Sequence, residues 1–261
     1  MILLTTCVCL AASAALAGCG AAAHRQATLA PATTPSATRA AIGTADWYCL
    51  NAGERREMLM LRGPGHDRLA ALTIGTGRVT VVLAHHASGS LCQWWPYARS
   101  LAAAGYRVVA FDFDGCGASP PGDGDYPGEV AAAAEWARGH GARQIVLMGG
   151  SMGGTAVIVA AARLGASITG VIDLSGPAAF ASMDALGAAR RVRVPVLFGY
   201  GTQDGAFAEG VQAVRAATAS HDKPVVTVPG GTHGAALVDP EVGYPSVRDA
   251  VLRFIRAATR S

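Results

Sequence analysis

Short apolar runs alternate along this chain with alanine-rich segments of helical length. Each apolar run has the length of one buried strand, and the segments between the runs carry the apolar spacing of amphipathic helices. Strands that are separated by helices run parallel, and helices then cover both faces of the sheet. The alternation therefore predicts an α/β fold with a mostly parallel sheet. The helices are expected at residues 94–104, 129–138, 155–164, 207–220 and 244–258.

The first two apolar runs break this alternation, because no helix lies between them. Residues 57–62 and 68–74 are separated only by Gly63-Pro64-Gly65-His66-Asp67, which is rich in turn residues. This pattern predicts a hairpin that forms an antiparallel edge of the sheet.

A serine lies between glycines where an apolar run meets a helical segment. The run 144–148 leads into Gly149-Gly150-Ser151-Met152-Gly153, and a helix is expected from Thr155. Glycines on both sides allow a strand and a helix to approach closely, while the serine between them takes a strained backbone that exposes its hydroxyl. A glycine-rich turn without a catalytic role is the alternative interpretation. We expect Ser151 to be a nucleophile.

A serine hydroxyl needs a base to remove its proton and a carboxylate to orient that base. Asp204 follows the apolar run 194–200, and His233 follows the run 223–228. Each therefore lies at the carboxyl end of an expected strand, where open parallel sheets place their sites. The order Ser151, Asp204, His233 predicts a catalytic triad. Asp173, at the end of the run 170–174, is the alternative acid.

At this point the chain resembles the α/β-hydrolase family, from about Ala52 to the C-terminus. The resemblance rests on the elbow, on the acid and histidine loops, and on two earlier segments. These are Val79-Thr80-Val81-Val82-Leu83-Ala84-His85-His86 and the stretch from Ala104 to Ser119, in which Asp112-Phe113-Asp114-Gly115-Cys116-Gly117-Ala118-Ser119 is similar to the family's Asp-x-x-Gly-x-Gly-x-Ser loop.

The resemblance implies a serine hydrolase that cleaves a carboxylic ester, or a related acyl bond, through an acyl-enzyme. Backbone amides of Ala87 and Met152 match the two donors that hold the oxyanion. One departure is His86, because many members have glycine there; the second histidine adds bulk and a titratable group. Two alternatives are an acyltransferase or peptidase on the same fold, and a catalytically silent binding lipoprotein.

Three other features receive structural interpretations. His85 and His86 lack the spacing and carboxylate companions of a metal site, so loop packing is expected. Trp94, Trp95 and Tyr97 are expected in the core or in a cleft wall. Residues 175–194 offer the only room for a lid and are few, which predicts a fairly open cleft.

Composition argues against several other classes of protein. The net charge of +3 is spread without basic runs, which argues against nucleic acid as a partner. The one lysine, Lys223, is not in a glycine-rich loop, and no Gly-x-Gly-x-x-Gly occurs, so no nucleotide is expected. No metal or organic cofactor is implied, and the expected partner is a small-molecule acyl substrate.

The start of the chain resembles a bacterial export signal. Residues 1–18 are predicted to be a signal peptide; their apolar, uncharged part, Ile2 to Ala17, is too short for a comfortable membrane span of about 20 residues. They end in Leu16-Ala17-Gly18-Cys19, which resembles the lipobox in which the cysteine is lipidated. Residues 19–45, rich in Ala, Thr, Pro and Ser, are expected to be a disordered tether before a catalytic domain at 46–261. We expect a lipid anchor on the outer face of the membrane; plain secretion is the alternative.

Export would place the cysteines in an oxidising compartment. Once the signal is removed and Cys19 is lipidated, Cys49, Cys92 and Cys116 remain, which allows one pair and one free thiol or three free thiols. A Cys49–Cys92 bridge would attach the chain before the first strand to the start of the helix after the predicted oxyanion loop, and Cys92–Cys116 is the alternative pairing. Cys116 is expected to be a small packing residue.

Overall fold

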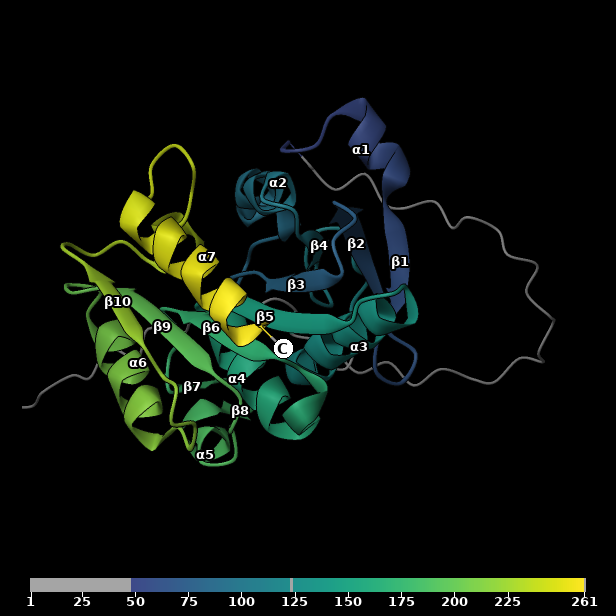
Figure 1. Cartoon of the computed structure of the whole chain (residues 1–261). Coiled ribbons are helices and arrows are strands. Elements are labelled where there is room, and N and C mark those ends of the chain that lie inside the picture. The colour runs from purple at the N-terminus through teal and green to yellow at the C-terminus, as the bar shows by residue number, and fades with distance from the viewer. Residues whose placement is uncertain (1–47, 123, 261) are drawn as a thin grey trace, which may run out of the picture.

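Eight strands form one mixed sheet in the computed structural model, which describes residues 48–122 and 124–260 (Figure 1). The sheet order is β1-β2-β4-β3-β5-β6-β9-β10. The pairs β1–β2 and β2–β4 are antiparallel, and all the other neighbours are parallel. The strands are β1 (Leu59–Arg62), β2 (Arg68–Ile74), β3 (Val79–Ala84), β4 (Arg107–Phe111), β5 (Gln144–Gly150), β6 (Gly170–Leu174), β9 (Val196–Gly201) and β10 (Val225–Val228).

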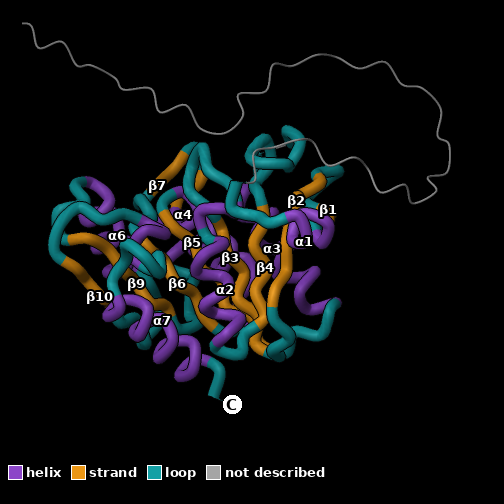
Figure 2. The backbone as a smooth tube through the Cα atoms, turned by 90° about the horizontal axis from the view of Figure 1, so that it is seen from above, coloured by secondary structure: helices purple, strands orange, loops and turns teal. Residues whose placement is uncertain are grey.

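Helices cover both faces of this sheet (Figures 1 and 2). Helices α3, α4, α5 and α6 lie on one face of the sheet, and α2 and α7 lie on the other face. Helix α1 lies beside β1 and β2. The helices are α1 (Ala52–Glu57), α2 (Trp95–Ala103), α3 (Tyr126–Gly139), α4 (Met152–Leu164), α5 (Ala185–Ala189), α6 (Ala206–Ala217) and α7 (Pro245–Ala258). The predicted mostly parallel sheet with an antiparallel edge is confirmed.

The strands divide their side chains between two cores. Along β3, Val82 packs with the helices of the α3 and α4 face, whereas Val81 and Leu83 pack with those of the α2 and α7 face. Because successive side chains of a strand point to opposite faces, a strand buried on both sides is apolar without interruption. This explains why the sequence showed unbroken apolar runs instead of alternation.

Several helix boundaries differ from the sequence expectation. Residue 57 was expected in a strand but ends α1, because Asn51 and Glu54 form a capping box: the Asn51 side chain accepts from the Glu54 amide at 3.0 Å, and Glu54 accepts from the Asn51 amide at 2.8 Å. Helix α3 begins at Tyr126 instead of residue 129, and a proline follows in its first turn, where a missing N–H costs no helical hydrogen bond.

The segment expected to offer room for a lid packs against the domain. It forms a small hairpin, β7 (Ala179–Phe180) with β8 (Met183–Asp184), followed by α5. Ala185, Ala188 and Ala189 are buried in the core shared with α4 and α6. This part of the chain therefore belongs to the body of the fold.

The predicted signal peptide (residues 1–18), the predicted tether (19–45) and Cys19 lie outside the described residues. Within the described ranges, none of the helices combines the length and apolarity that a bilayer crossing requires.

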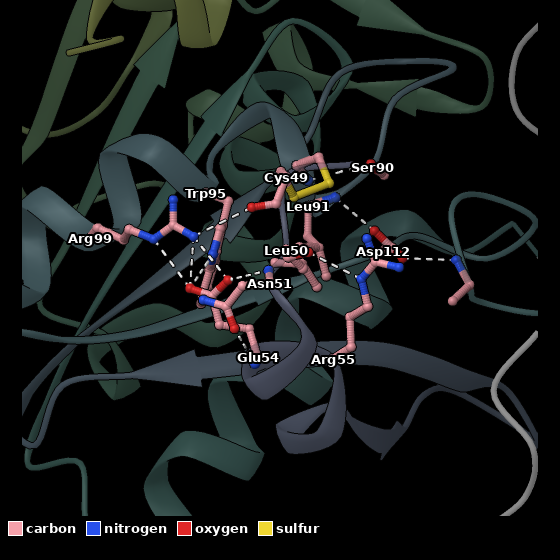
Figure 3. The surroundings of a disulfide bond; sticks show 12 residues. Cys49, Leu50, Asn51, Glu54, Arg55, Ser90, Leu91, Trp95, Arg99 and Asp112 are labelled. Carbon is pink, nitrogen blue, oxygen red and sulfur yellow. Dashed lines mark hydrogen bonds and ion pairs between the residues drawn. A yellow bond between two sulfur atoms is a disulfide. The ribbon is translucent and has the colours of Figure 1, made fainter. Parts of the chain in front are cut away.

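A disulfide joins Cys49 to Cys92, with 5.5 Å between their Cα atoms (Figure 3). It links the segment before α1 to the short 3₁₀ helix η1 (Leu91–Gln93), as the sequence analysis proposed. Cys116 is buried in the core and is disulfide-bonded as well, so the free thiol considered for it is wrong.

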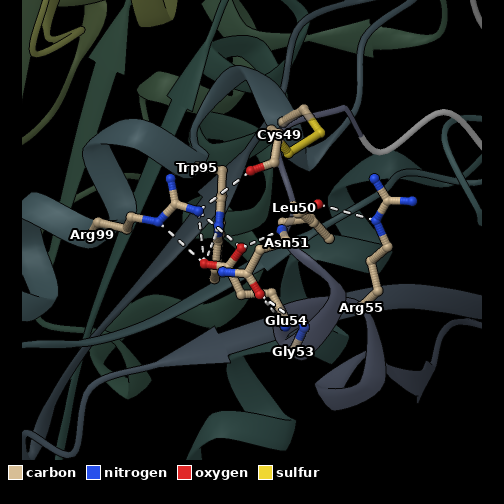
Figure 4. Close-up of polar contacts among 9 residues, drawn as sticks. Cys49, Leu50, Asn51, Gly53, Glu54, Arg55, Trp95 and Arg99 are labelled. Atoms are coloured by element: carbon tan, nitrogen blue, oxygen red, sulfur yellow. Dashed lines mark hydrogen bonds and ion pairs between the residues drawn. A yellow bond between two sulfur atoms is a disulfide. The ribbon is translucent and has the colours of Figure 1, made fainter.

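Polar contacts reinforce the same attachment (Figure 4). Arg99 of α2 forms an ion pair with Glu54 at 2.7 Å, and the Trp95 indole N–H donates to the same carboxylate at 3.1 Å. Arg55 donates to the Leu50 carbonyl at 3.0 Å. Helix α1, which has no buried residue of its own, is thus attached to η1 by the disulfide and to α2 by the contacts of Glu54.

Loss of the Cys49–Cys92 bridge should destabilise the domain. The bond closes a loop with a sequence separation of 43, and in the chain-entropy model a loop of that size contributes about 4 kcal/mol. The double variant Cys49→Ser/Cys92→Ser should therefore melt roughly 8 to 16 °C below the wild type. Calorimetry without reductant makes the comparison, because the disulfide of Cys116 then stays intact in both proteins.

A non-reduced digest provides the direct control for this prediction. A linked Cys49–Cys92 peptide is expected by mass spectrometry. Free thiols at both positions, or a Cys92–Cys116 peptide, would contradict the pairing.

Candidate active site

Ser151 occupies the junction between β5 and α4 in a strained backbone conformation. Its φ is 53° and its ψ is −122°, a region that residues other than glycine rarely adopt. The Ser151 amide donates to the Leu174 carbonyl of β6 at 2.9 Å, and the Ser151 carbonyl accepts from Thr155 in the first turn of α4 at 3.1 Å. The backbone is thus held on both sides, and the side chain stands at the tip of a sharp turn.

The flanking glycines are required by contact distances. A Cβ on Gly149 would lie 2.1 Å from the Gly153 carbonyl oxygen, and a Cβ on Gly153 would lie 2.2 Å from the Ala84 carbonyl oxygen. Both distances are far below any non-bonded contact that a carbon atom tolerates. The start of α4 consequently lies directly against the ends of β5 and β3, as the glycine pattern indicated.

Asp204 and His233 meet at the same edge of the sheet. Asp204 follows β9 and His233 follows β10, and the His233 Nδ1 lies 2.8 Å from Oδ2 and 3.0 Å from Oδ1 of Asp204. The Asp204 side chain is only 7 % exposed. When Nδ1 donates to this carboxylate, the lone pair of the neutral ring is on Nε2. The ring of Phe207, 4.3 Å away between centroids, packs against His233.

The loop that carries His233 lies next to the serine turn. A Cβ on Gly150, which precedes Ser151, would be 3.0 Å from the Ala235 amide nitrogen, two residues after His233. Among the described residues no hydrogen bond joins the Ser151 hydroxyl to His233. Catalytic hydrogen bonds are often long or poorly aligned before substrate binds, so this geometry is compatible with a serine–histidine pair.

Asp173, the alternative acid, faces a different neighbourhood. Its Oδ1 accepts from the Gly176 amide at 2.9 Å and would lie 2.3 Å from a Cβ on Gly154. Complete burial raises the pKa of Asp173 to about 7, although the Gly176 hydrogen bond opposes the shift. The His233 Nδ1 is bonded to Asp204 instead, so the structure pairs the histidine with the later acid.

The two proposed oxyanion donors come from the loop after β3 and from the first residue of α4. Ala87 is half-buried and Met152 is buried. Outside the regular hydrogen bonds of helices and strands, no protein acceptor within the described residues takes either amide. Both N–H groups therefore remain available to a ligand.

The loop after β3 is fixed by a buried histidine. His85 accepts from the Phe113 amide at Nε2, at 3.0 Å, and its Nδ1 lies 2.6 Å from the His86 carbonyl oxygen, to which it donates. Complete burial lowers the pKa of His85 to about 4. A neutral His85 thus joins the loop after β3 to the loop after β4.

Asp112 anchors the loop after β4. Its Oδ1 accepts from the Leu91 amide at 2.6 Å (Figure 3). Its Oδ2 accepts from the Ala118 amide at 2.8 Å, and its carbonyl accepts from the Ser119 hydroxyl at 2.5 Å. A Cβ on Gly117 would collide with this carboxylate at 2.2 Å. The Asp-x-x-Gly-x-Gly-x-Ser pattern therefore forms a turn whose two glycines are exposed and whose hydrogen bonds are made by the buried Asp112 and Ser119.

The aromatic residues at the start of α2 belong to the core, one of the two placements expected for them. Trp94, Trp95 and Tyr97 are all buried, and the Trp94 indole N–H donates to the Ala84 carbonyl at 2.9 Å. Within the ranges described, no group of three or more His, Cys, Asp or Glu residues is arranged to hold a metal ion.

His86 has contacts that the sequence analysis did not predict. Its Nε2 accepts from the Ala235 amide at 2.8 Å, and its ring meets the His233 ring edge-on at 5.7 Å between centroids. Desolvation, followed by the nearby His233 and His85, lowers the pKa of His86 to about 3. The sequence signal was the departure from His-Gly, which indicated added bulk but gave no partner.

Comparison with known proteins agrees with the α/β fold described above. The family model of the α/β-hydrolase fold matches residues 79–200. No curated protein matches the chain in sequence. Among solved structures, an esterase of Pyrococcus furiosus is 18 % identical with a TM-score of 0.65, covering 77 % of this chain and 89 % of the esterase.

Two further solved structures have the same architecture. The monoacylglycerol lipase of Paleococcus ferrophilus is 21 % identical, with a TM-score of 0.61 and coverage of 73 % of this chain and 99 % of the lipase. Proline iminopeptidase from Mycobacterium smegmatis is 13 % identical, with a TM-score of 0.63 and coverage of 77 % and 98 %. At these identities the likeness establishes the fold: the chain has the α/β-hydrolase fold.

Proposed function

We propose that this chain is a serine hydrolase that cleaves a carboxylic ester through an acyl-enzyme intermediate. The observation that carries the proposal is the Asp204–His233 pair, 2.8 Å apart, beside a serine held at a φ of 53°. The esterase and the lipase with the same fold support ester hydrolysis as the reaction.

Each residue has a defined part in the proposed reaction. The Ser151 oxygen attacks the substrate carbonyl while the His233 Nε2 takes the hydroxyl proton, and the same proton then passes to the departing alcohol. Asp204 keeps the His233 ring in the required tautomer and stabilises the imidazolium. The amides of Ala87 and Met152 bind the oxyanion, and water then repeats the sequence on the acyl-enzyme.

A peptidase on the same site is the second candidate. The observation that favours it is the likeness to a proline iminopeptidase. The triad would act in the same way, but the leaving group would be an amine. A screen of p-nitrophenyl esters of rising chain length beside aminoacyl nitroanilides separates the two activities, and transfer of the acyl group to an added alcohol would identify an acyltransferase.

We also propose that the protein is exported and lipid-anchored at Cys19. The support is the sequence Leu16-Ala17-Gly18-Cys19 after an apolar stretch and the disulfide between Cys49 and Cys92, a bond typical of proteins outside the reducing cytosol.

Substitution of the nucleophile should abolish the chemistry. Ser151→Ala should eliminate covalent labelling by a fluorophosphonate and reduce turnover by a factor on the order of 10⁴ to 10⁶, because no other group can form the acyl-enzyme. Ser100, exposed on α2, provides the matched control, and Ser100→Ala should label like the wild type. An unlabelled wild type would favour the silent binding protein, and a fully labelled Ser151→Ala would move the nucleophile elsewhere.

The two candidate acids should differ in their effect on turnover. Asp204→Asn should cost about 10³ to 10⁴ in turnover with the fold intact, because the imidazole loses the partner that sets its tautomer. Asp173→Asn should cost much less, since its amide oxygen can still accept from Gly176. Steady-state kinetics on one ester, with circular dichroism as the folding control, ranks them. The opposite ranking would assign the acid to Asp173.

Anchoring should depend on the Cys19 thiol. Cys19→Ser should release the protein from the membrane fraction or block its processing, whereas the wild type should partition into the detergent phase of a two-phase extraction. Mass spectrometry of the mature N-terminus checks the modification. A peptide in which Cys19 is disulfide-linked to Cys116 would rule out lipidation, because one sulfur cannot carry both bonds.

A further inference from the structure

His86 lies between the two loops that carry Ser151 and His233. Its imidazole Nε2 accepts from the Ala235 amide at 2.8 Å. Ala235 is the second residue of the 3₁₀ helix η3 (Gly234–Leu237), which starts immediately after His233. The first N–H groups of a helix lack partners within the helix. His86 supplies the acceptor, because no side chain caps η3 and the His233 side chain is bonded to Asp204.

Glycines on both sides make room for the His86 ring. A Cβ on Gly150, just before Ser151, would lie 2.8 Å from the His86 Nε2, and a Cβ on Gly234, just after His233, would lie 2.5 Å from it. Gly234 also has a φ of +56°. The residues next to both proposed catalytic residues therefore lack a side chain where the same imidazole nitrogen lies.

The ring is fixed from its own side as well. The His86 amide donates to the Gln93 side-chain oxygen at 2.8 Å, and the Trp94 ring lies edge-on at 6.4 Å between centroids. Because burial lowers the pKa of His86 to about 3, the ring is neutral at neutral pH and keeps a lone pair on Nε2 for Ala235. The proton of the neutral His86 ring is then on Nδ1. A neutral His86 also places no second positive charge next to the imidazolium that His233 forms in the proposed reaction.

We propose that His86 is a positioning residue that holds the His233 loop in place against the Ser151 turn through its neutral Nε2. The inference rests on the proposed function, since it assigns a role in the same triad. A glycine at position 86 would have no side chain to accept a hydrogen bond from the Ala235 amide. The position of His233 matters for turnover, because displacement of a catalytic base by about 1 Å can cost on the order of 100-fold in rate.

Three substitutions separate the acceptor from the bulk of the ring. His86→Phe keeps a ring without an acceptor, His86→Asn keeps a polar side chain too short to reach Ala235, and His86→Gln places an amide oxygen near the position of Nε2. His86→Phe and His86→Asn should lower kcat for a p-nitrophenyl ester about 10- to 100-fold with KM little changed. His86→Gln should recover most of this loss, and the exposed His221 gives the control His221→Phe, with unchanged kinetics.

Amide hydrogen exchange at Ala235 provides a readout that does not depend on catalysis. Its protection should fall about tenfold or more in His86→Phe and His86→Asn and return in His86→Gln, while the wild type should show a ¹⁵N spectrum of His86 with the proton on Nδ1. If the wild type does not react with a fluorophosphonate, the proposed function fails, whereas the exchange result still decides whether His86 holds this loop.

Two results would overturn the inference. One is wild-type kcat in both His86→Phe and His86→Asn while Ser151 remains the labelled residue. The other is unchanged Ala235 protection in both variants, which would show that the 2.8 Å contact does not hold the loop.

Discussion

The close approach of α4 to the ends of β3 and β5 is the constraint on which the rest of the site depends. It is possible only because Gly149 and Gly153 have no side chains, since a Cβ at either position would lie 2.1 to 2.2 Å from a carbonyl oxygen. The turn between them leaves Ser151 with a positive φ, a conformation that is costly and persists only where the surroundings hold it. The Leu174 carbonyl and the first turn of α4 supply that hold.

Around this turn, the loops at the carboxyl ends of the parallel strands are joined by polar side chains buried between them. His85 joins the loops after β3 and β4, Asp112 joins the loop after β4 to η1, and His86 joins the loop after β3 to η3. Each bond satisfies a backbone N–H that would otherwise be buried without a partner, which would cost about 1 to 3 kcal/mol. Burial keeps both histidines neutral, so each retains an acceptor nitrogen for its partner. The loops of the candidate site are therefore joined to one another as well as to the sheet.

The sequence predicted the sheet and its antiparallel edge well, because strands buried on both faces leave unbroken apolar runs. The sequence also predicted that Asp204 and His233 lie at the same edge of the sheet, because both follow parallel strands. The two side chains are hydrogen-bonded there. The capping box that turns residues 52–57 into α1 was overlooked, although its signal, Asn51 followed by Glu54, is local. The Ala235 contact of His86 could not be predicted, because it joins positions 149 residues apart and depends on the exact place of two loops.

The Cys49–Cys92 disulfide also determines how a mechanical force would pass through the domain. The covalent bridge encloses α1, β1, β2 and β3 in a loop with a sequence separation of 43. A pull applied at Tyr48, directly before Cys49, is therefore transmitted through the disulfide to η1 and the start of α2, and the enclosed elements carry none of the tension in series. Edge strand β1, which has a single neighbour in the sheet and would otherwise be the first to peel away, is shielded. The load instead enters at Leu91 and Trp94, whose side chains are fully buried, so resistance to stretching depends on the core beneath α2.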